Sequence, residues 1–162
     1  MHEIEIRQGS TSLAQSLISD PLRGAIKDIH GTLMKKMFLI FNHTLTQRQQ
    51  KDAVDSLKVT EFIHLPNDLQ QLWQRIPTSS EKIAPCLQPL EDWLLSHAQK
   101  GDYVLIQGDF GACYLMVKFA HNNGYIPVYS TTQREAIEMH DDDGSIHMQH
   151  IIKHCRYRQY GD

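Results

Sequence analysis

The chain has 162 residues, of which 41% are hydrophobic, enough for one compact domain whose core needs neither disulfides nor metal. Its formal net charge of −3 gives no overall field that would hold a long nucleic acid nonspecifically. A nucleic-acid ligand would therefore need a local basic site.

The cysteines and the hydropathy pattern indicate the compartment. Cys86, Cys113 and Cys155 are an odd number without paired spacing, which favours a reducing compartment over a disulfide framework. No apolar run reaches the roughly 20 residues that span a bilayer, and the chain does not begin with a basic segment followed by an apolar one. We therefore expect a cytoplasmic protein that is neither secreted nor embedded in a membrane.

Residues 1–36 are predicted to be an N-terminal extension. The segment "HEIEIRQ" alternates like a strand, and the helical pattern after it is interrupted at Asp20-Pro21 and ends near Gly31. Because "MKKMFLIF" is typical of a natural chain start, we interpret the residues before it either as an element added to one domain over residues 37–162 or as a poorly ordered segment that results from an over-long start.

The first part of the domain alternates strands with helices. "MFLIF" is a wholly apolar run of the kind found in strands buried on both faces, and a helix capped by Thr46 follows it. "TEFIHL" predicts a second strand, after which Pro66 begins a polar helix. The loop at residues 77–80 leads to a long helix over residues 81–99.

The second part predicts two more strands and a hairpin. "DYVLIQ" is the third strand, residues 110–122 the next helix, and "YIPVYS" the fourth strand. After Arg134 an Asp-Gly turn between two alternating stretches predicts a terminal hairpin. The expected fold is therefore α/β, a Rossmann-like, mostly parallel sheet with right-handed crossovers, flanked by helices and ending in a β-hairpin.

Polar residues follow each predicted parallel strand. The first strand ends in residues 42–44, the second in His64, the third in residues 107–111 and the fourth in residues 130–134. Ligands of open parallel sheets bind beyond the carboxyl ends of the strands. We expect these strand ends to open on one rim.

The third strand end suits a phosphate. Gly108 and Gly111 let a backbone approach a ligand closely, and the helix start after them offers unpaired N–H groups to an anion. The alternative is that both glycines only make a tight turn. Phe110 can either stack on a base or pack over the helix start. Neither GxxxxGK[ST] nor GxGxxG is present, which disfavours mononucleotide hydrolysis and nicotinamide binding.

The fourth strand end and the C-terminus add positive charge. Arg134 beside Ser130, Thr131 and Thr132 suits phosphate oxygens, unless it only pairs with a nearby carboxylate at the surface. On a strand, His154, Arg156 and Arg158 share one face, and Lys153, Cys155 and Tyr157 share the other. Aromatic residues between basic ones favour a nucleic-acid-like ligand over a merely solvated strand.

Three histidines near the C-terminus have a spacing that a metal site could use. His147, His150 and His154 would share one face of a helix and could bind zinc. The alternating pattern favours strands instead, which puts His147 on the opposite face. We therefore expect no metal and no cofactor.

Five segments carry a family resemblance. "FLIFNHTLT", "IHLP", "YVLIQGDFGA", "YIPVYSTTQRE" and "KHCRYRQY", in this order and spacing, resemble the small CRISPR-associated family called Csx-twenty, of the CRISPR-associated Rossmann-fold (CARF) superfamily. The resemblance runs from about residue 34 to residue 160, and QGDFG and TTQRE are its most specific parts.

The resemblance implies a ring nuclease of type III CRISPR systems. Such proteins bind cyclic oligoadenylates, most often cyclic tetra-adenylate, as homodimers, and linearise them by attack of a ribose 2′-hydroxyl without metal. The implied catalytic residues are Arg134 and Thr132, with His43 and His154 as proton carriers. The implied ligand-binding residues are Asn42, Thr44, Gln107, Gly108, Asp109, Phe110, Gly111, Ser130, Thr131, Lys153 and Arg156.

Two other functions stay open at this stage. A sensor or sponge would bind the same messenger without cutting it. A metal-dependent nuclease would use the three C-terminal histidines. Long nucleic acids and membranes are not expected as partners.

Overall fold

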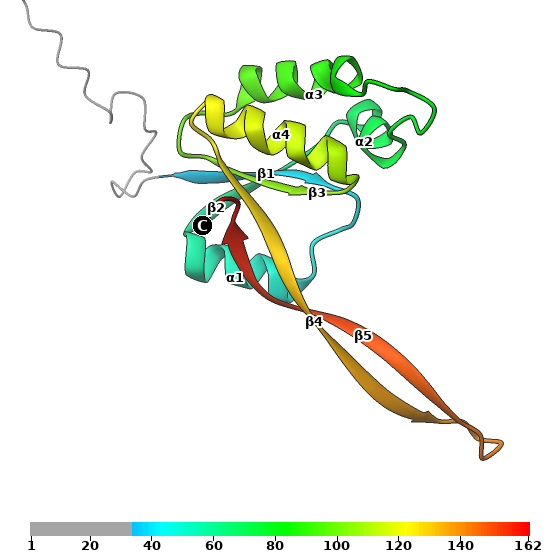
Figure 1. Ribbon diagram of the computed structural model, residues 1–162. Helices are drawn as coiled ribbons and strands as arrows, with labels where there is room; N and C mark the ends of the chain where they lie inside the picture. The colour runs from blue at the N-terminus through cyan, green and yellow to red at the C-terminus, as the bar shows by residue number, and fades with distance from the viewer. Residues whose placement is uncertain (1–33) are drawn as a thin grey trace, which may run out of the picture.

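Five strands pair into one sheet in the structure, a computed structural model that describes residues 34–162 (Figure 1). They are β1 (Lys35–Phe41), β2 (Val59–His64), β3 (Tyr103–Gln107), β4 (Ile126–His140) and β5 (Ile146–Gln159). Their order is β2-β1-β3-β4-β5, with all neighbours parallel except the antiparallel pair β4 and β5. The strand and helix expected within residues 1–33 lie outside the described residues.

Helices cover both faces of this sheet. They are α1 (Gln47–Leu57), α2 (Asn67–Gln74), α3 (Ala84–His97) and α4 (Phe110–Asn122). Helix α1 packs on one face, and α2, α3 and α4 lie on the other (Figure 1). The α/β prediction, with a mostly parallel sheet and a C-terminal hairpin, is confirmed. No helix between residues 34 and 162 is long and apolar enough to cross a membrane.

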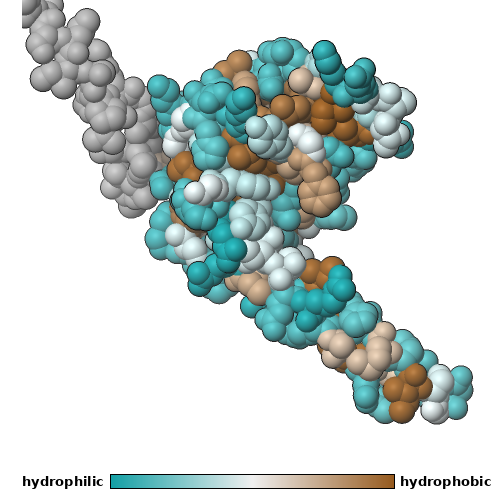
Figure 2. Space-filling model, in the orientation of Figure 1, coloured by the Kyte–Doolittle hydropathy of each residue, from teal (hydrophilic) through white to brown (hydrophobic). Residues whose placement is uncertain are grey.

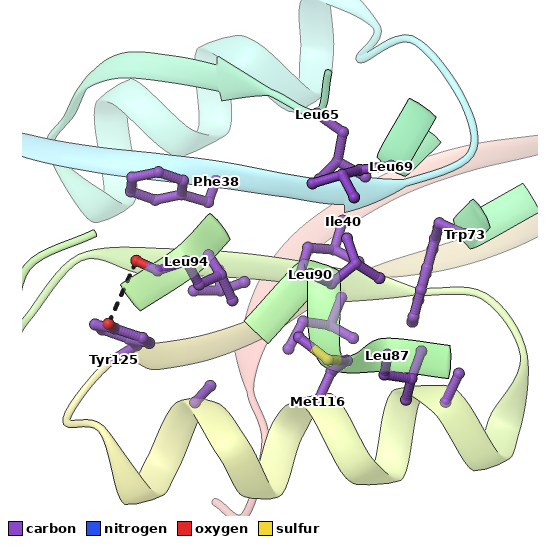
Figure 3. Packing of buried hydrophobic residues seen from close by; sticks show 14 residues of the cluster. Phe38, Ile40, Leu65, Leu69, Trp73, Leu87, Leu90, Leu94, Met116 and Tyr125 are labelled. Carbon is purple, nitrogen blue, oxygen red and sulfur yellow. Dashed lines mark hydrogen bonds between the residues drawn. The ribbon is translucent and has the colours of Figure 1, made fainter. Parts of the chain in front are cut away.

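The adjacent strands β1 and β3 are buried from both sides, as the apolar run of β1 predicted. Phe38 and Ile40 of β1 face α2, α3 and α4, where they meet Trp73 and Leu90 (Figure 3). Met37 and Leu39 face α1 and its fully buried Ala53, with Val128 in the same cluster. A strand covered on both faces has no polar side, which is why its sequence shows no alternation.

The helix boundaries follow from local signals. Thr46 caps α1 as predicted, because its hydroxyl accepts the N–H of Gln49 at 3.2 Å and the Gln49 side chain accepts the N–H of Thr46 at 2.9 Å. Helix α3 begins at Ala84, three residues later than predicted. Pro85 fits the first turn of a helix, where its missing N–H costs nothing.

The fourth strand does not end where the sequence suggested. β4 runs without a break from Ile126 to His140, so the predicted fourth strand and the first strand of the hairpin are one element. β5 pairs with it from Val128 to His140. The polar run Ser130–Arg134 is rich in β-branched residues and has a hydrogen-bonding partner strand, so its polarity marks the loss of burial and not the end of the strand.

Beyond the parallel strands and the helices that cover them, β4 and β5 continue as a two-stranded ribbon (Figure 1). The predicted Asp-Gly turn closes it at Gly144, whose φ is +85°. Apolar side chains lie exposed along the ribbon (Figure 2). They are Met139, Ile146, Met148 and Ile152, at 41–63% exposure. A ribbon of this kind is only marginally stable by itself, so a covering surface would stabilise it.

Gly108 is required by packing at the end of β3. A Cβ at this position would lie 2.9 Å from the indole ring of Trp73, which is 1% exposed and donates its Nε1–H to the carbonyl of Gln107 at 3.1 Å. Gly108→Ala is expected to lower the free energy of unfolding by about 1–3 kcal/mol, since the buried ring must shift.

The matched control is Gly111→Ala. Its Cβ would meet the flexible end of Ile83 at 3.2 Å and, at an ordinary van der Waals distance of 3.4 Å, Oδ1 of Asp109. Alanine favours a helix over glycine by up to about 1 kcal/mol. Urea unfolding of both variants measures the difference. Equal stability for the two variants would contradict the packing explanation.

A buried tyrosine, Tyr157, and a half-buried one, Tyr160, differ in how their hydroxyls are satisfied. The hydroxyl of Tyr157 has no hydrogen-bond partner among the described residues, while that of Tyr160 donates to the carbonyl of Ile106 at 2.8 Å. Tyr157→Phe is therefore expected to leave the free energy of unfolding unchanged or to raise it, and Tyr160→Phe to lower it by about 1 kcal/mol. Chemical denaturation measures both, and the reverse order would refute the assignment.

Candidate functional site

Side chains from one helix and four strands line a hollow of about 330 Å³ at the carboxyl ends of β1 and β3, which we call the rim pocket. The predicted ligand-site residues that it brings together are His43, Thr44, Gln107, Ser130, Thr132 and His154. Phe41, Thr46, Gln49 and Ile152 complete the lining. A binding site in this position is expected of a parallel sheet whose crossovers diverge between β1 and β3.

One wall of the rim pocket holds a chain of hydrogen bonds. The Oγ of Ser130 lies 2.6 Å from Nδ1 of His154, and Nε2 of His154 lies 2.9 Å from Oδ2 of Asp52. Ser130 is 6% exposed and His154 5%. With Asp52, which is half-buried, they form a serine–histidine–aspartate array (the array).

Other groups hold the array in place. Nε2 of Gln49 donates to the Ser130 hydroxyl at 3.3 Å, and Oε1 of Gln107 accepts the Ser130 N–H at 3.0 Å. Asp52 accepts the hydroxyl of Ser56 at 2.6 Å and the N–H of Tyr157 at 3.0 Å. Every member thus has at least two partners, as buried polar groups require.

The surroundings of Asp52 keep its carboxylate charged. Partial burial alone would raise the pKa of this carboxyl. The hydrogen bonds from Ser56, His154 and Tyr157 outweigh burial, so the pKa lies below its ordinary value of 3.8. A charged carboxylate can only accept hydrogen bonds, and this assigns the proton between the two residues to Nε2 of His154.

A bulge in β5 brings His154 into this position. Thr131 pairs with Arg156 and Thr132 with His154, so Cys155 has no partner of its own in β4. His154 and Tyr157 consequently lie on the same side, with ring centroids 4.8 Å apart. The prediction that His154 shares a face with Arg156 and Arg158 was wrong, because strict alternation fails across a bulge.

The expected basic residues lie outside the lining of the rim pocket. Arg134 is an exposed mid-strand residue opposite Ile152, and not a residue just past a strand end. It lies two residues beyond Thr132 and therefore on the same face of β4. Lys153 forms an ion pair with Glu135 on the other face. Thr131 bonds the backbone of Arg156, which is exposed.

Asp109 occupies the helix start at which the sequence predicted a phosphate. Its carboxylate accepts the N–H of Ala112 at 2.9 Å and so caps α4. A negative charge therefore already satisfies this terminus. Gly111 lies in the first turn of α4, and Gly108 is explained by the contact with Trp73.

Phe110 belongs to a second hollow of about 500 Å³. The ring is 94% exposed and lies with those of Tyr114, Tyr129 and Tyr160 around this hollow. It neither covers the start of α4 nor lines the rim pocket.

Asn42 and His64 line a third hollow, between the ends of β1 and β2. The Oδ1 of Asn42 is buried without a hydrogen-bond partner among the described residues. His147 contacts Asp141 at 3.0 Å, and His150 lies opposite Ala136. Within residues 34–162 no group of three His, Cys, Asp or Glu side chains is placed to hold a metal ion.

Sequence reasoning missed Gln49 and Asp52. Both lie on the face of α1 that turns toward β4 and β5, as does Ala53. The available signal was the spacing of Gln49, Asp52, Ala53 and Ser56 at intervals of three, four and seven. When the face of a helix that packs on a sheet carries polar residues among small ones, those polar residues need polar partners on the sheet.

The comparisons with known proteins concern the region described above. The model of the "Uncharacterized protein MJ1673 family" matches residues 35–158. The chain is 51% identical over 127 residues to "Uncharacterized protein MJ1673" of Methanocaldococcus jannaschii, an alignment that covers 78% of this chain and 98% of the archaeal protein. No solved structure matches significantly.

Asp52→Asn tests the electrostatics of the array. A depressed carboxyl pKa stabilises the fold above the ordinary value of 3.8, and that stability is lost as the pH falls through the folded-state pKa. At pH 7 the variant is expected to lose about 1–3 kcal/mol of unfolding free energy. At pH 3 its deficit relative to wild type should shrink.

The control for this experiment is Asp55→Asn. Asp55 pairs with Lys51 at the surface, where both side chains are more than half exposed, so its effect should stay within about 0.5 kcal/mol. Urea unfolding at both pH values measures the two variants. A deficit in Asp52→Asn that is independent of pH would show that the carboxylate is not the source.

Proposed function

The chain belongs to the MJ1673 family. From the resemblance of its strand-end segments to CARF proteins and from the geometry of the rim pocket, we propose that it is a ring nuclease of CARF type. It binds a cyclic oligoadenylate, most readily cyclic tetra-adenylate, and opens the ring without a metal. The observation that carries the proposal is the array, which presents an imidazole-linked hydroxyl at the carboxyl ends of a Rossmann-like sheet.

The array can accept the proton of a ribose 2′-hydroxyl. Both ring nitrogens of His154 have partners, so the group that faces the pocket is the Ser130 hydroxyl. Ser130 takes the 2′-hydroxyl proton as it passes its own to Nδ1 of His154, and Asp52 stabilises the imidazolium. The freed 2′-oxygen then attacks the adjacent phosphorus, which gives a 2′,3′-cyclic phosphate as the bond to the 5′-oxygen breaks.

The leaving 5′-oxygen needs a proton donor on another side of the scissile bond. His43 is exposed and lines the same pocket from the end of β1. It can protonate the 5′-oxygen. Two histidines, one buried in the array and one exposed, divide the acid and base roles.

Charge on the phosphate needs a cation. No Lys or Arg lines the rim pocket among the described residues. Arg134 follows Thr132 on the same face of β4, and a guanidinium that reaches over the opening would bind phosphate oxygens in bidentate fashion. Thr132 and Gln107 add hydrogen bonds from within the pocket.

A homodimer suits both the ligand and the surface. A cyclic messenger with two-fold symmetry fits a site built from the same rim of two subunits. The exposed apolar side chains of the ribbon would gain a cover in such an assembly. A second subunit would also place further cations around the ligand.

A messenger sensor or sponge is the second candidate function. Both ring nitrogens of His154 already have hydrogen-bond partners, and no Lys or Arg of the described residues lines the rim pocket. Both observations argue against turnover of a bound messenger. This candidate uses the same pocket and the same ligand. It differs only in the fate of the ring.

Single-turnover cleavage of radiolabelled cyclic tetra-adenylate in EDTA tests the proposal, with binding measured on the same samples. Wild type is expected to give linear product with a 2′,3′-cyclic phosphate end. Arg134→Ala should still bind but cleave about 100- to 1,000-fold more slowly, because it removes charge stabilisation in the transition state.

Arg158→Ala is the matched control. Arg158 lies on the opposite face of the same strand pair, bound to the Tyr129 hydroxyl at 3.2 Å, so its removal should change the cleavage rate by less than about threefold. Tight binding by wild type without cleavage would select the sensor. If the chain neither binds nor cleaves a cyclic oligoadenylate of any ring size, the proposal is wrong.

A further inference from the structure

We infer that Ser130 is an activated nucleophile, able to attack the carbonyl carbon of a small carboxylic ester bound in the rim pocket. This activity requires no ribose hydroxyl and no cyclic nucleotide. It therefore stands or falls separately from ring cleavage. The inference rests on the contacts of the array, the lining of the pocket and the burial of Ser130.

The protonation pattern of the array aims a lone pair at Ser130. The carboxylate of Asp52 accepts the Nε2–H of His154, so in the neutral imidazole Nδ1 carries no proton and can only accept. The neighbouring hydroxyl of Ser130, at 2.6 Å, must then donate its proton to Nδ1. A hydroxyl hydrogen-bonded to an imidazole that a carboxylate orients is the arrangement of an activated serine.

The roles match those of a serine–histidine–aspartate triad with the two ring nitrogens exchanged. In the familiar arrangement Nε2 faces the serine and Nδ1 faces the aspartate. Here Nδ1 faces Ser130 and Nε2 faces Asp52, at distances of 2.6 and 2.9 Å. Because the nitrogens belong to one conjugated ring, a proton gained at either is stabilised by a carboxylate at the other.

Burial restricts which electrophiles reach Ser130. The residue is 6% exposed, and its hydroxyl faces a hollow of about 330 Å³. Phe41 and Ile152 add apolar surface, and no Lys or Arg lines this hollow among the described residues. A small, uncharged acyl group fits these walls.

Hydrogen-bond donors are available for the negative charge that develops on the carbonyl oxygen. The amide nitrogen of Gln49 already points at the Ser130 hydroxyl, 3.3 Å away. The hydroxyl of Thr132 lines the same hollow. Donors fixed in a buried site stabilise such charge more strongly than water does.

The reaction balances in two steps. The Ser130 oxygen bonds to the carbonyl carbon as its proton moves to Nδ1 of His154; the bond to the leaving alcohol then breaks, and the alcohol oxygen takes that proton. Water next attacks the acyl carbon and gives a proton to Nδ1. The bond to Ser130 breaks, its oxygen recovers the proton, and a carboxylic acid leaves.

Labelling with a small alkyl fluorophosphonate tests the inference on the full chain. Attack by Ser130 forms an oxygen–phosphorus bond and expels fluoride, so intact mass spectrometry should show one adduct per chain, and fragmentation should place it on Ser130. A burst of about one equivalent of p-nitrophenol from p-nitrophenyl acetate should accompany it. Because the adduct is mapped on wild type, the result does not depend on a variant that folds.

Variants of the chain distinguish an activated Ser130 from a serine that is only accessible to the reagent. Ser130→Ala should abolish the adduct, and Asp52→Asn should slow labelling at least about 100-fold, since the imidazole loses its orienting charge. Ser145→Ala removes an exposed serine of the turn and should change nothing. No adduct, or adducts spread over surface residues at the rate of the urea-unfolded chain, would overturn the inference.

Ring cleavage measured on the same preparations distinguishes the nucleophilic Ser130 from the proposed ring nuclease. Labelling of Ser130 without ring cleavage supports the nucleophile and contradicts the ring nuclease. Ring cleavage with an unreactive Ser130 overturns the nucleophile and leaves the array as a proton relay.

Discussion

The contact between Asp52 of α1 and His154 of β5 fixes the geometry on which the site depends. The two residues are 102 positions apart in the chain, and a 2.9 Å hydrogen bond joins them. The same carboxylate accepts the N–H of Tyr157 at 3.0 Å. One side chain thus fastens an edge strand to the helix that covers it, and so holds the base of the ribbon against the carboxyl ends of β1 and β3.

Burying this much polar surface is costly unless every group is paired. Four polar or charged residues are buried among those described, and Gln49, Ser130 and His154 are three of them. Each has its hydrogen bonds within the array or beside it. Apolar residues of similar size often stabilise such a contact as well or better, so the stability of the fold does not by itself account for these polar residues.

Two departures from regular structure shape the site. The bulge at Cys155 turns His154 and Tyr157 toward α1 and leaves Arg156 outside. The continuation of β4 past the body places Thr132 in the pocket and Arg134 beyond it. Both depend on pairing between β4 and β5 and would be lost if the strands slipped by one residue.

The sequence by itself determined the elements and their order, because buried strands, caps and turns leave local signals such as "MFLIF", Thr46 and the Asp-Gly turn. It also marked the polar strand ends, of which His43, Gln107, Ser130 and Thr132 meet in one pocket with His154. It did not reveal where β4 ends, because a polar strand and a loop have similar compositions. Only the tertiary structure assigned Asp52 to His154 and separated Arg134 from the lining, since contacts between distant residues depend on register, a bulge and helix docking.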